Sequence, residues 1–569
     1  MMRDKIEIIV REALQALGVE VGVVNIEHPA DSSHGDYATN AALMYGKAKG
    51  VSPRMLAGEL VEKILETSSD DIAKIEIAGP GFINFFLSDT TLESAILRRT
   101  ALRKNEENEG RSFVKTGERV NVEFVSTNPT GELHIGHGRS AFFGDTLARV
   151  LALTGAEVTR EFYINDSRES NQIRELGKTA LGKGEQYKTP ELVEKMAKLD
   201  FTGLSEEEAG VLLATAVQAG NRAFIEKELG VNFDVWYSED AELRASGANT
   251  AMLALLKERN FTYEKDGALW LKTSEYGDDE DRVIVRSDGT VPYFLADIAY
   301  HQKKFDRGFQ AVINVWGADH HGHIKRMQAV GRMLGWPARH CLSLNKDSQA
   351  MAGGQKAGTG ADQPIVFIAQ MVSLKEDGVS SKMSKRAGNV ILLRDLVAEF
   401  GIDIVRWFFI EKALNTQMAF DMALAREKSE KNPVYYVQYA HARLSSVIEK
   451  AKARNAEILG SPGLPETGRT ALPETKGFAE LFKTPSARAL AMKIAELPEV
   501  VADIAESYAV HSLTGYAVAL ATATNAFYRD VRIVTDDGVD TTALALALRA
   551  KETLAETLAL LGISAPDRM

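Results

Sequence analysis

Two histidines separated by two residues form the strongest chemical signal in the chain. His134 and His137 lie in the run 129–139, PTGELHIGHGR, which follows a strand-like stretch at 120–125 and precedes a long apolar-periodic helix. Residues three apart point to one side of a helix, so both imidazoles can face the same ligand. Gly136 lets a ligand approach the backbone, and the helix N-terminus offers N–H groups to phosphate. A bare pair at this spacing is more often an ordinary helix cap, but the strand–turn–helix setting favours a nucleotide site.

A cluster of cations supplies the second signal. The run 381–390, SKMSKRAGNV, places Lys382, Lys385 and Arg386 within five residues, among small side chains. Cations on a loop can bind a polyphosphate and stabilise the charge that develops as it leaves. Taken alone, a run of this kind is usually a solvated basic loop.

Elements that could position these two runs recur along the middle of the chain. Strand-like stretches at 120–125, 311–316 and 365–368 alternate with helical patterns. The alternation predicts an α/β fold with a doubly wound, Rossmann-like and largely parallel sheet, which binds ligands at the carboxyl ends of its strands.

Shifts in pattern divide the chain into four segments. A strand–turn–strand closes an α+β N-terminal domain at 1–90, and a charged helical connector follows at 91–115. The predicted catalytic domain spans 116–425 and includes a glycine-rich surface insertion at 346–363. From 426 to 569 the pattern is almost wholly helical, which predicts an all-α bundle.

Composition limits the class of protein. The 569 residues are 45% hydrophobic and 26% charged, which is typical of globular chains with several domain cores. The single cysteine, Cys341, excludes a disulfide framework and any multi-cysteine zinc or iron–sulfur site. No apolar run reaches the length of a membrane span and the amphipathic N-terminus is unlike a signal peptide, so we expect a cytoplasmic protein without membrane contact. The formal net charge of −12 does not exclude RNA, because residues 431–569 are nearly neutral and phosphate needs only a local basic surface.

The two runs together resemble the HIGH and KMSKS signatures of class I aminoacyl-tRNA synthetases. Within that class the chain is similar to the arginyl-tRNA synthetase family over nearly its whole length. The similarity is carried by 123–131 (EFVSTNPTG), 316–322 (WGADHHG), 432–443 (NPVYYVQYAHAR) and 562–566 (GISAP). The glycine-rich insertion departs from the family pattern, as does Arg386 where the second signature ends in serine.

This resemblance implies an arginine–tRNA ligase, with ATP, L-arginine and tRNA(Arg) as its partners. Arginine would be activated to arginyl adenylate while tRNA is bound, and then transferred to the 3′-terminal adenosine, releasing AMP and pyrophosphate. Catalysis is assigned to His134, His137, Lys382 and Lys385. The residues implied to bind ATP are Thr130, Gly131, His134, Gly136, His137, Gly317, Asp319, Lys382, Met383, Ser384 and Lys385. Mg²⁺ is expected with the ATP phosphates, and the protein is expected to be a monomer.

The guanidinium of the expected substrate is planar and always charged, so its pocket needs carboxylates and a hydroxyl instead of a hydrophobic slot. The resemblance implies that Glu123, Tyr293 and Asp297 hold this group. It also implies that Ser126 and Asn128 hold the α-amino and carboxylate ends of arginine. Tyr293 and Asp297 are four residues apart, hence on one face if the segment is helical. The alternative for these two is a packed aromatic and a helix cap.

The histidine-rich run 319–323, DHHGH, allows two interpretations. Its histidines and Asp319 could hold a metal, but the local spacing does not place three ligands on one face, so we expect no bound metal or zinc. The resemblance instead places Gly317 and Asp319 beside the ribose and the amino acid, which makes Asp319 a candidate for both sites.

Recognition of tRNA is expected at both ends of the chain. The resemblance implies that Phe82 stacks on a D-loop nucleotide and that Asn84 bonds to its base edge. The alternative is that both are strand residues in a core, which is less expected for the polar Asn84. The helical C-terminal domain should hold the anticodon stem-loop, with Tyr435, Tyr439 and Arg443 facing the RNA or the catalytic domain.

Two other classes of protein share part of this pattern. Other nucleotidylyl transferases with a similar histidine motif are usually far shorter and lack a helical RNA-binding domain. A tRNA-binding relative without catalysis would not need the complete set of His134, His137, Lys382 and Lys385. The sequence therefore favours the ligase.

Overall fold

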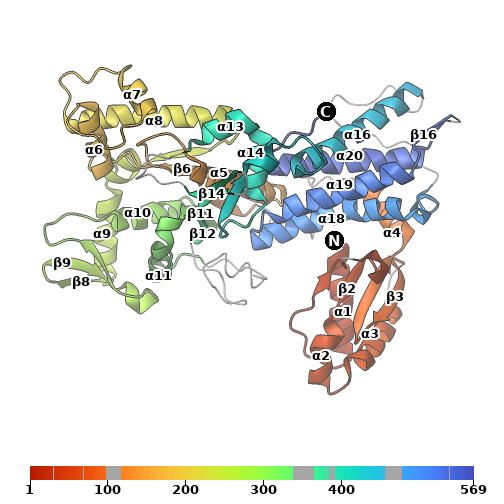
Figure 1. Cartoon of the computed structure of the whole chain (residues 1–569). Helices are drawn as coiled ribbons and strands as arrows, with labels where there is room; N and C mark the ends of the chain where they lie inside the picture. Colours follow the sequence, from red (N-terminus) through yellow and green to blue (C-terminus); the bar gives the residue numbers. More distant parts are fainter. Residues whose placement is uncertain are drawn as a thin grey trace.

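The computed structural model describes residues 1–29, 31–67, 70–97, 117–337, 364–376, 379–382, 391–454, 477–536 and 538–569. The N-terminal domain, the central sheet with its insertions and the C-terminal bundle follow one another from red to blue in Figure 1. The predicted α/β catalytic domain, with an α+β domain before it and a helical bundle after it, is confirmed.

The N-terminal domain packs helices on one face of an antiparallel sheet whose strand order is β1-β2-β4-β3. Ile83, Phe85 and Leu87, alternate residues of β4, are buried in the core that these helices share, as the two-residue period of a strand requires. The elements are α1 (Met2–Ala16), β1 (Ile26–Glu27), η1 (Ser32–His34), β2 (Tyr37–Thr39), α2 (Ala41–Lys49), α3 (Pro53–Thr67), β3 (Ile72–Ala78), β4 (Phe82–Leu87) and α4 (Asp89–Leu97).

The central sheet has five parallel strands in the order β12-β11-β5-β6-β7. Its strands are β5 (Arg119–Glu123), β6 (Glu157–Ile164), β7 (Val235–Ser238), β11 (Ala311–Gly317) and β12 (Ile365–Ala369). The long helix α5 (Ile135–Leu153) follows β5 and shares a hydrophobic core with Val120, Val122 and Ile313 of the sheet. The three strands expected from the sequence, at 120–125, 311–316 and 365–368, are therefore all present.

The strand order reverses direction between β5 and β11, because the chain runs from β5 outward to β6 and β7 and returns to β11 on the other side. A ligand crevice is expected outside the carboxyl ends at such a switch point. Glu123 ends β5 and Gly317 ends β11. In register, Glu123 lies between Asn314 of β11 and Glu161 of β6, which places three buried polar side chains in a row.

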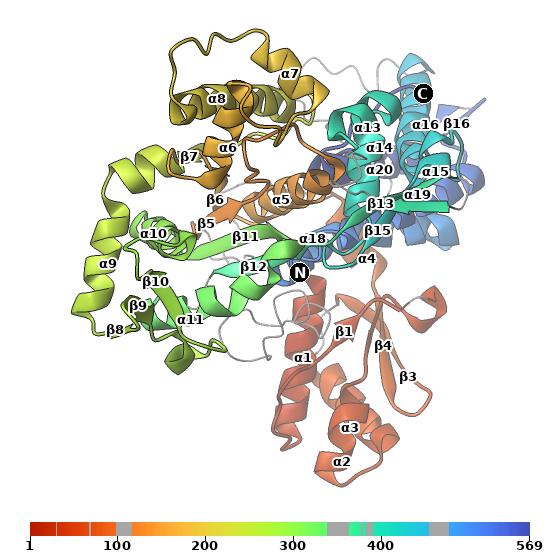
Figure 2. The ribbon, with the colours of Figure 1, turned by 60° about the vertical axis from the view of Figure 1, so that its left-hand side comes forward.

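Two insertions interrupt the catalytic domain, and the sequence patterns gave no account of either. The first consists of α6 (Asn171–Ala180), α7 (Pro190–Met196) and α8 (Glu206–Lys227). The second consists of η2 (Asp240–Ala245), α9 (Ala248–Glu258), β8 (Thr262–Lys265), β9 (Ala268–Leu271), η3 (Thr273–Tyr276), β10 (Arg282–Val285) and α10 (Tyr293–Asp306), with an antiparallel sheet ordered β10-β9-β8. Figure 2 shows the gold helices α6–α8 and the green segment from α9 to β10 on the side of the sheet away from the blue bundle.

The remaining elements lead from the sheet into the bundle. After β11 come η4 (Ala318–His323) and α11 (Ile324–Leu334). A small sheet ordered β14-β13-β15 contains β13 (Val372–Glu376), β14 (Val379–Lys382) and β15 (Met418–Asp421), and α13 (Leu393–Phe400), α14 (Ile402–Ile410) and α15 (Met422–Arg426) surround it. The bundle consists of α16 (Pro433–Arg454), η6 (Leu481–Lys483), α18 (Pro485–Ser507), α19 (Ser512–Asp530), the hairpin β16 (Val534–Thr535) and β17 (Gly538–Val539), and α20 (Thr541–Leu561).

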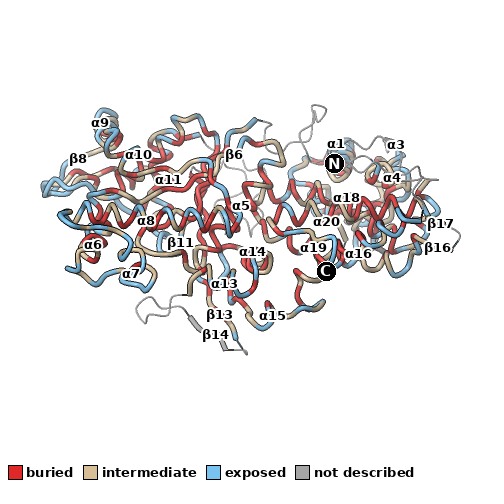
Figure 3. Tube along the Cα trace, turned by 90° about the horizontal axis from the view of Figure 1, so that it is seen from above, coloured by how far each residue is buried: buried red, intermediate tan, exposed pale blue. Residues whose placement is uncertain are grey.

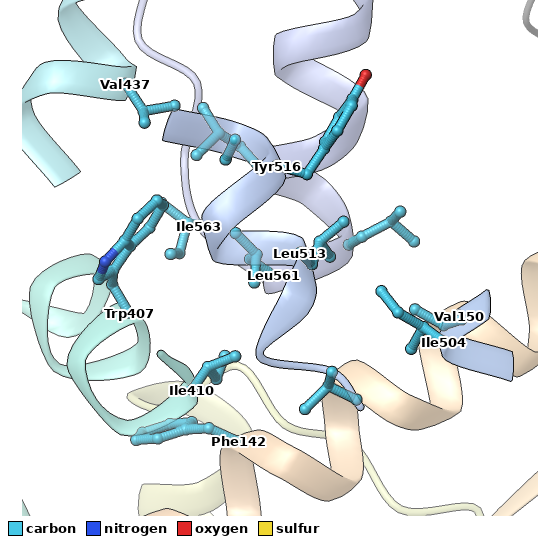
Figure 4. Close-up of a cluster of buried hydrophobic side chains, with 14 of the residues drawn as sticks. Phe142, Val150, Trp407, Ile410, Val437, Ile504, Leu513, Tyr516, Leu561 and Ile563 are labelled. Carbon is cyan, nitrogen blue, oxygen red and sulfur yellow. The ribbon is translucent and has the colours of Figure 1, made fainter. Parts of the chain in front are cut away.

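One hydrophobic core continues from the catalytic sheet into the bundle. Buried segments run from the sheet through α5 and α14 to α18–α20 in Figure 3. In Figure 4, Phe142 of α5 lies beside Ile410 of α14, and Trp407 of α14 lies beside Ile563 at the end of the bundle. The catalytic and helical domains are thus joined by packing as well as by the chain.

The N-terminal domain docks on α18 of the bundle through charged groups. The buried carboxylate of Glu499 accepts hydrogen bonds from Tyr37 Oη at 3.0 Å and from the Arg3 backbone N–H at 3.1 Å, and His28 Nε2 lies 3.0 Å from its other oxygen. Arg3 also pairs with Asp503 through both terminal nitrogens. These contacts place the two predicted tRNA-reading domains side by side.

Candidate functional site

The two signature runs are brought together by backbone hydrogen bonds. Ile135 N–H donates to the carbonyl of Ile391 at 3.1 Å, and Leu393 N–H donates to the carbonyl of Leu133 at 2.8 Å. This short antiparallel bridge ties the start of α5 to the segment that directly follows the cationic run. The side chain of Lys382 and the whole of Met383, Ser384 and Lys385 lie outside the described residues.

An ion-pair network reinforces the same junction. Glu132, whose side chain is 6% exposed, lies 3.1 Å from Arg394 Nε of α13 and 3.4 Å from Lys195 Nζ of α7. Asn221 of α8 donates to the carbonyl of Gly131 at 3.0 Å. The first insertion therefore contacts the loop before α5 directly.

The histidine pair is ordered by its own backbone. The His134 and His137 rings stack with centroids 3.7 Å apart and planes 24° apart, on one side of the helix start as predicted. His134 Nδ1 accepts from the Gly136 N–H at 3.1 Å, and His137 Nδ1 accepts from the His134 N–H at 3.0 Å. Because both Nδ1 atoms accept, each neutral ring carries its proton on Nε2 and can donate it to a phosphate oxygen.

Gly136 is required by this arrangement. A Cβ at this position would lie 2.9 Å from His134 Cε1, closer than side chains pack. Thr130, earlier in the same loop, donates its backbone N–H to the carbonyl of Asn128 at 2.8 Å. The loop is therefore a tight turn that ends in the helix cap, which is the geometry expected for phosphate at a helix N-terminus.

The turn after β5 carries backbone strain. Val125 and Ser126 have φ values of 70° and 39°, in the left-handed region that non-glycine residues rarely adopt. Ser140 Oγ accepts from the Val125 N–H at 2.9 Å, and Ser126 Oγ accepts from the Tyr163 N–H at 3.1 Å, so the strain is held by specific bonds. Asn128 is exposed at the end of the turn. Strained backbone of this kind concentrates at functional sites.

Acidic side chains converge at the carboxyl ends of β5 and β7. Glu123 is 5% exposed, and its Oε2 accepts from the ammonium of Lys304 at 2.6 Å. Asp297, on the first turns of α10, faces both Glu123 and Glu239. Burial and the two neighbouring carboxylates raise the pKa of Asp297 to about 7, although the nearby Arg326 acts to lower it.

Glu239 and Tyr163 are pocket residues that the sequence analysis missed. Glu239 is 2% exposed, and burial raises the pKa of this carboxyl although Arg244 Nη2 lies 3.1 Å away. The Tyr163 hydroxyl donates to Glu239 and faces Asp297 and Glu123. Glu239 directly follows β7, so its position at a strand end was the signal that could have identified it.

Other predicted residues of the site lie at its rim or beyond it. Tyr293 is the first residue of α10, on the same helix as Asp297 as predicted, and it is 55% exposed. The Asp319 side chain is 84% exposed in η4, and its described ion pair is with His320 at 3.7 Å. The structure does not bring Asp319 into the carboxylate cluster. A Cβ at Gly317 would lie 2.7 Å from Asp319 Oδ1, so this glycine shapes the start of η4. Within the described ranges, no three histidine, cysteine or acidic side chains gather as metal ligands.

The predicted D-loop residues differ from expectation in their exposure. Asn84 is 4% exposed on β4, an interior strand of the N-terminal sheet, whereas Phe82 is half-buried. The polar residue is thus the more enclosed of the two, and the sequence analysis had expected the reverse. Phe82 is the more accessible surface for a nucleotide base.

The predicted C-terminal RNA residues lie on one face of α16. The Arg443 guanidinium lies 4.6 Å from the ring centroid of Tyr439 and 4.9 Å from that of Tyr528 on α19. It donates to Asn525 Oδ1 at 3.1 Å and to Tyr439 Oη at 3.0 Å. Tyr439 is 48% exposed and Tyr435 is half-buried one turn before it. A guanidinium ordered between aromatic rings at the surface can stack with nucleotide bases.

Family models match most of the chain, apart from residues 1–3, 88–99 and 373–436. Residues 4–87 match the family described as "Arginyl tRNA synthetase N terminal domain". Residues 100–173 and 171–372 match "tRNA synthetases class I (R), catalytic domain", and residues 437–569 match "DALR anticodon binding domain".

Curated relatives and solved structures agree with these matches. The proteins named "Arginine--tRNA ligase" from Oceanobacillus iheyensis and Geobacillus kaustophilus are 37% and 39% identical, covering all of this chain and 98% and 99% of theirs. A putative arginyl-tRNA synthetase from Campylobacter jejuni is 30% identical, covers 85% of this chain and 100% of its own, and superposes with a TM-score of 0.66. The Thermus thermophilus arginyl-tRNA synthetase, 22% identical over all of both chains, shares the fold with a TM-score of 0.72. Among the described residues, no helix is long and apolar enough to cross a membrane.

Proposed function

Since the chain belongs to the class I arginyl-tRNA synthetases and carries the arginine–tRNA ligase activity of that family, we propose a role in this reaction for each part of its site. ATP and L-arginine meet beyond the carboxyl ends of β5 and β11, and the tRNA lies across the N-terminal and helical domains. The observation that supports this arrangement best is the cluster of buried carboxylates at the edge of the parallel sheet.

The carboxylate cluster is proposed to hold the guanidinium of arginine. Glu123 and Glu239 are buried and Asp297 is half-buried beside them, which is unfavourable for three carboxylates unless a cation joins them. A guanidinium supplies one positive charge and five donors in a plane, which suits several carboxylate oxygens at once. Tyr293, exposed at the rim, offers a hydroxyl to the same group.

The other end of the amino acid is proposed to lie at the strained turn. Ser126 and Asn128 follow β5 directly and can bind the α-amino and carboxylate groups of arginine. Their place between the carboxylate cluster and the histidine pair sets the arginine carboxylate towards the ATP α-phosphate. Asp319 borders the ribose and the amino acid in this proposal, since η4 follows the end of β11.

ATP is proposed to bind along the histidine loop and the cationic run. His134 and His137 donate Nε2–H to the phosphates, and the α5 N-terminus adds backbone donors. The residues that line the nucleotide in this proposal are Thr130, Gly131, Gly136, Gly317, Asp319, Lys382, Met383, Ser384 and Lys385. Mg²⁺ is proposed to arrive with the ATP phosphates as part of the substrate.

The chemistry follows from this placement. The arginine carboxylate attacks the α-phosphorus in line, and the bond to pyrophosphate breaks while Lys382, Lys385 and the histidines stabilise the departing charge. A hydroxyl of the terminal ribose of tRNA then attacks the carbonyl carbon of the adenylate, and AMP leaves. No protein nucleophile is needed, so the site works by positioning and electrostatics.

The two outer domains are proposed to hold the tRNA. Tyr435, Tyr439 and Arg443 present aromatic and cationic surface for the anticodon stem-loop. Phe82 and Asn84 are proposed to meet the D-loop, with Phe82 supplying the accessible ring. We propose that the protein acts as a monomer in the cytoplasm, where charged tRNA is used.

Pyrophosphate exchange with each of the twenty amino acids, with and without tRNA(Arg), tests the proposed substrate. We expect exchange with arginine, and only when tRNA is present. Exchange supported by any other amino acid would show that the carboxylate cluster does not select a guanidinium.

A further inference from the structure

A fully buried lysine lies behind the carboxylate cluster. Lys304, two turns along α10 from Asp297, is 0% exposed. Its ammonium lies 2.6 Å from Glu123 Oε2 and 3.0 Å from Asn314 Oδ1, and 4.4 Å from the ring centroid of Tyr300. Lysine is almost never fully buried without such partners, because its charge is costly to remove from water.

A chain of hydrogen bonds connects this lysine to the backbone of Asp297. Asn314 accepts from Lys304 through Oδ1, and its Nδ2 lies 2.6 Å from His301 Nε2. His301 Nδ1 lies 2.8 Å from the Asp297 carbonyl, which can only accept, so Nδ1 carries the proton and Nε2 accepts from the amide. Burial and the Lys304 charge lower the pKa of His301 to about 3, so the ring stays neutral. The donor and the acceptor of each hydrogen bond in this series are therefore fixed.

The three carboxylates of the pocket differ in whether a cation lies close to them. Glu123 is paired with Lys304 at 2.6 Å, and Glu239 with Arg244 at 3.1 Å. Among the described ion pairs, none includes the carboxylate of Asp297. Asp297 is therefore the carboxylate of the cluster without a close ion pair, and Arg326 is the cation in range of it.

We propose that Lys304 is a positioning and specificity-determining residue of the arginine site, because it neutralises Glu123 from within the fold and leaves Asp297 as the carboxylate without a described ion pair. The substrate guanidinium supplies that pair and is directed mainly to Asp297, while Glu123 stays paired with Lys304. The proposal rests on the proposed function and adds to it a charge balance set by Lys304. Without Lys304, the guanidinium would be drawn deeper, towards Glu123, and the arginine carboxylate would be displaced from the ATP.

Three variants separate this role from a direct one for Glu123. Glu123→Gln leaves the Lys304 charge unpaired beside the pocket, so the dissociation constant for arginine should weaken by at least about tenfold. Lys304→Met should bind arginine no more weakly than the parent protein, but its kcat for pyrophosphate exchange should fall by about tenfold because the substrate is misplaced. The double variant removes both charges and should regain at least about tenfold of the affinity that Glu123→Gln loses.

The double variant gives the decisive comparison, measured by isothermal titration calorimetry with L-arginine. If Glu123 contacted the guanidinium as its main partner, the double variant would bind as weakly as Glu123→Gln, and the proposal would be overturned. Lys303→Met is the matched control, because Lys303 is exposed and adjacent on the same helix. A Lys304→Met protein with the same kcat and KM as Lys303→Met would also overturn the proposal.

Folding is checked by thermal denaturation of every variant. If the double variant does not fold, the same comparison is made with Lys304→Gln combined with Glu123→Gln, in which two amides can hydrogen-bond. If neither charge-free pair folds while both single variants do, the ion pair serves the fold and the proposal is wrong. Exchange by the parent protein with arginine is measured first, so that failure of the proposed substrate is distinguished from failure of the Lys304 role.

Discussion

Binding of arginine should release a proton from Asp297. In the free protein this carboxyl faces Glu239 and Glu123, with Arg326 as the cation in range, and its pKa is raised to about 7 by burial and the two acidic neighbours. A bound guanidinium favours the ionised carboxylate and lowers that pKa. Arginine therefore binds the deprotonated form, and its affinity should rise as the pH rises through 7.

The size of the effect follows from the titration curve. With a pKa of about 7, roughly a tenth of Asp297 is ionised at pH 6 and roughly nine-tenths at pH 8. The dissociation constant for arginine should therefore be about tenfold weaker at pH 6 than at pH 8, and about half a proton should be released per arginine at pH 7.

Isothermal titration calorimetry can count these protons. L-Arginine is titrated at pH 6, 7 and 8 in pairs of buffers with different ionisation enthalpies, and the difference in observed heat gives the number released. ATP is left out so that His134 and His137 do not meet phosphate during the titration. Asp297→Asn should show a much weaker pH dependence, with Glu239 as the remaining carboxyl of raised pKa in the pocket, while Asp306→Asn, at the exposed end of the same helix, should behave as the parent protein. The reasoning is refuted if the parent protein releases no proton between pH 6 and pH 8, or if Asp297→Asn releases as much as the parent protein.

The same carboxyl makes the free protein sensitive to pH. A folded pKa raised from 3.8 to about 7 favours the protonated form, so its stabilising effect is complete below pH 4 and is lost as the pH rises through 7. The shift corresponds to roughly 4 kcal/mol across that window. Asp297→Asn should therefore unfold at higher urea concentration than the parent protein at pH 8, although it binds arginine more weakly.

Three further substitutions test other parts of the structure. Gly177→Ala would place a Cβ 1.7 Å from the Glu206 carbonyl, so the free energy of unfolding should fall by about 3 kcal/mol or more in urea titrations. Gly136→Ala should displace the His134 ring and lower the kcat of pyrophosphate exchange by about 10- to 100-fold, with the KM for arginine nearly unchanged. If the KM for arginine instead rose by the same factor as kcat fell, the assignment of His134 to the phosphate site would be wrong. Arg443→Met should raise the KM for tRNA by about 3- to 10-fold without changing exchange at saturating tRNA, whereas an unchanged KM would contradict RNA binding on this face.

Three strands of the parallel sheet, β5, β11 and β12, were predictable because they are buried on both faces. Stretches such as 311–316 and 365–368 are nearly continuous apolar runs, and a long, largely buried helix follows the first strand. The strands of the second insertion could not be predicted in the same way. Its strands β8 (TYEK), β9 (ALWL) and β10 (RVIV) have only four residues each, which is too short for a clear period to distinguish a strand from other structure.

The site was predictable where function depends on neighbours in sequence, and not where it depends on pairing across the sheet. His134 and His137 lie within one helical turn, so their stacking followed from spacing. Glu239 and Lys304 are separated from Glu123 by long stretches of chain and meet it only because strands and α10 align them. For a lysine in an amphipathic helix, the neighbouring sequence does not show whether the side chain forms a buried ion pair or is solvated.

The carboxylate cluster also bears on how accurately arginine is selected. A hydrophobic pocket discriminates one methylene by only about 1–3 kcal/mol. A neutral isostere such as citrulline would instead bring Asp297 no cation beyond Arg326, and removing one partner of an enclosed ion pair costs about 3–5 kcal/mol. That range corresponds to a selectivity of roughly 10²- to 10³-fold or more from binding alone. Protonation of Asp297 relieves the penalty, so the ratio of kcat/KM for arginine over citrulline should shrink as the pH falls from 8 to 6. A ratio that does not change over this range would show that shape, and not the charge of Asp297, excludes the isostere.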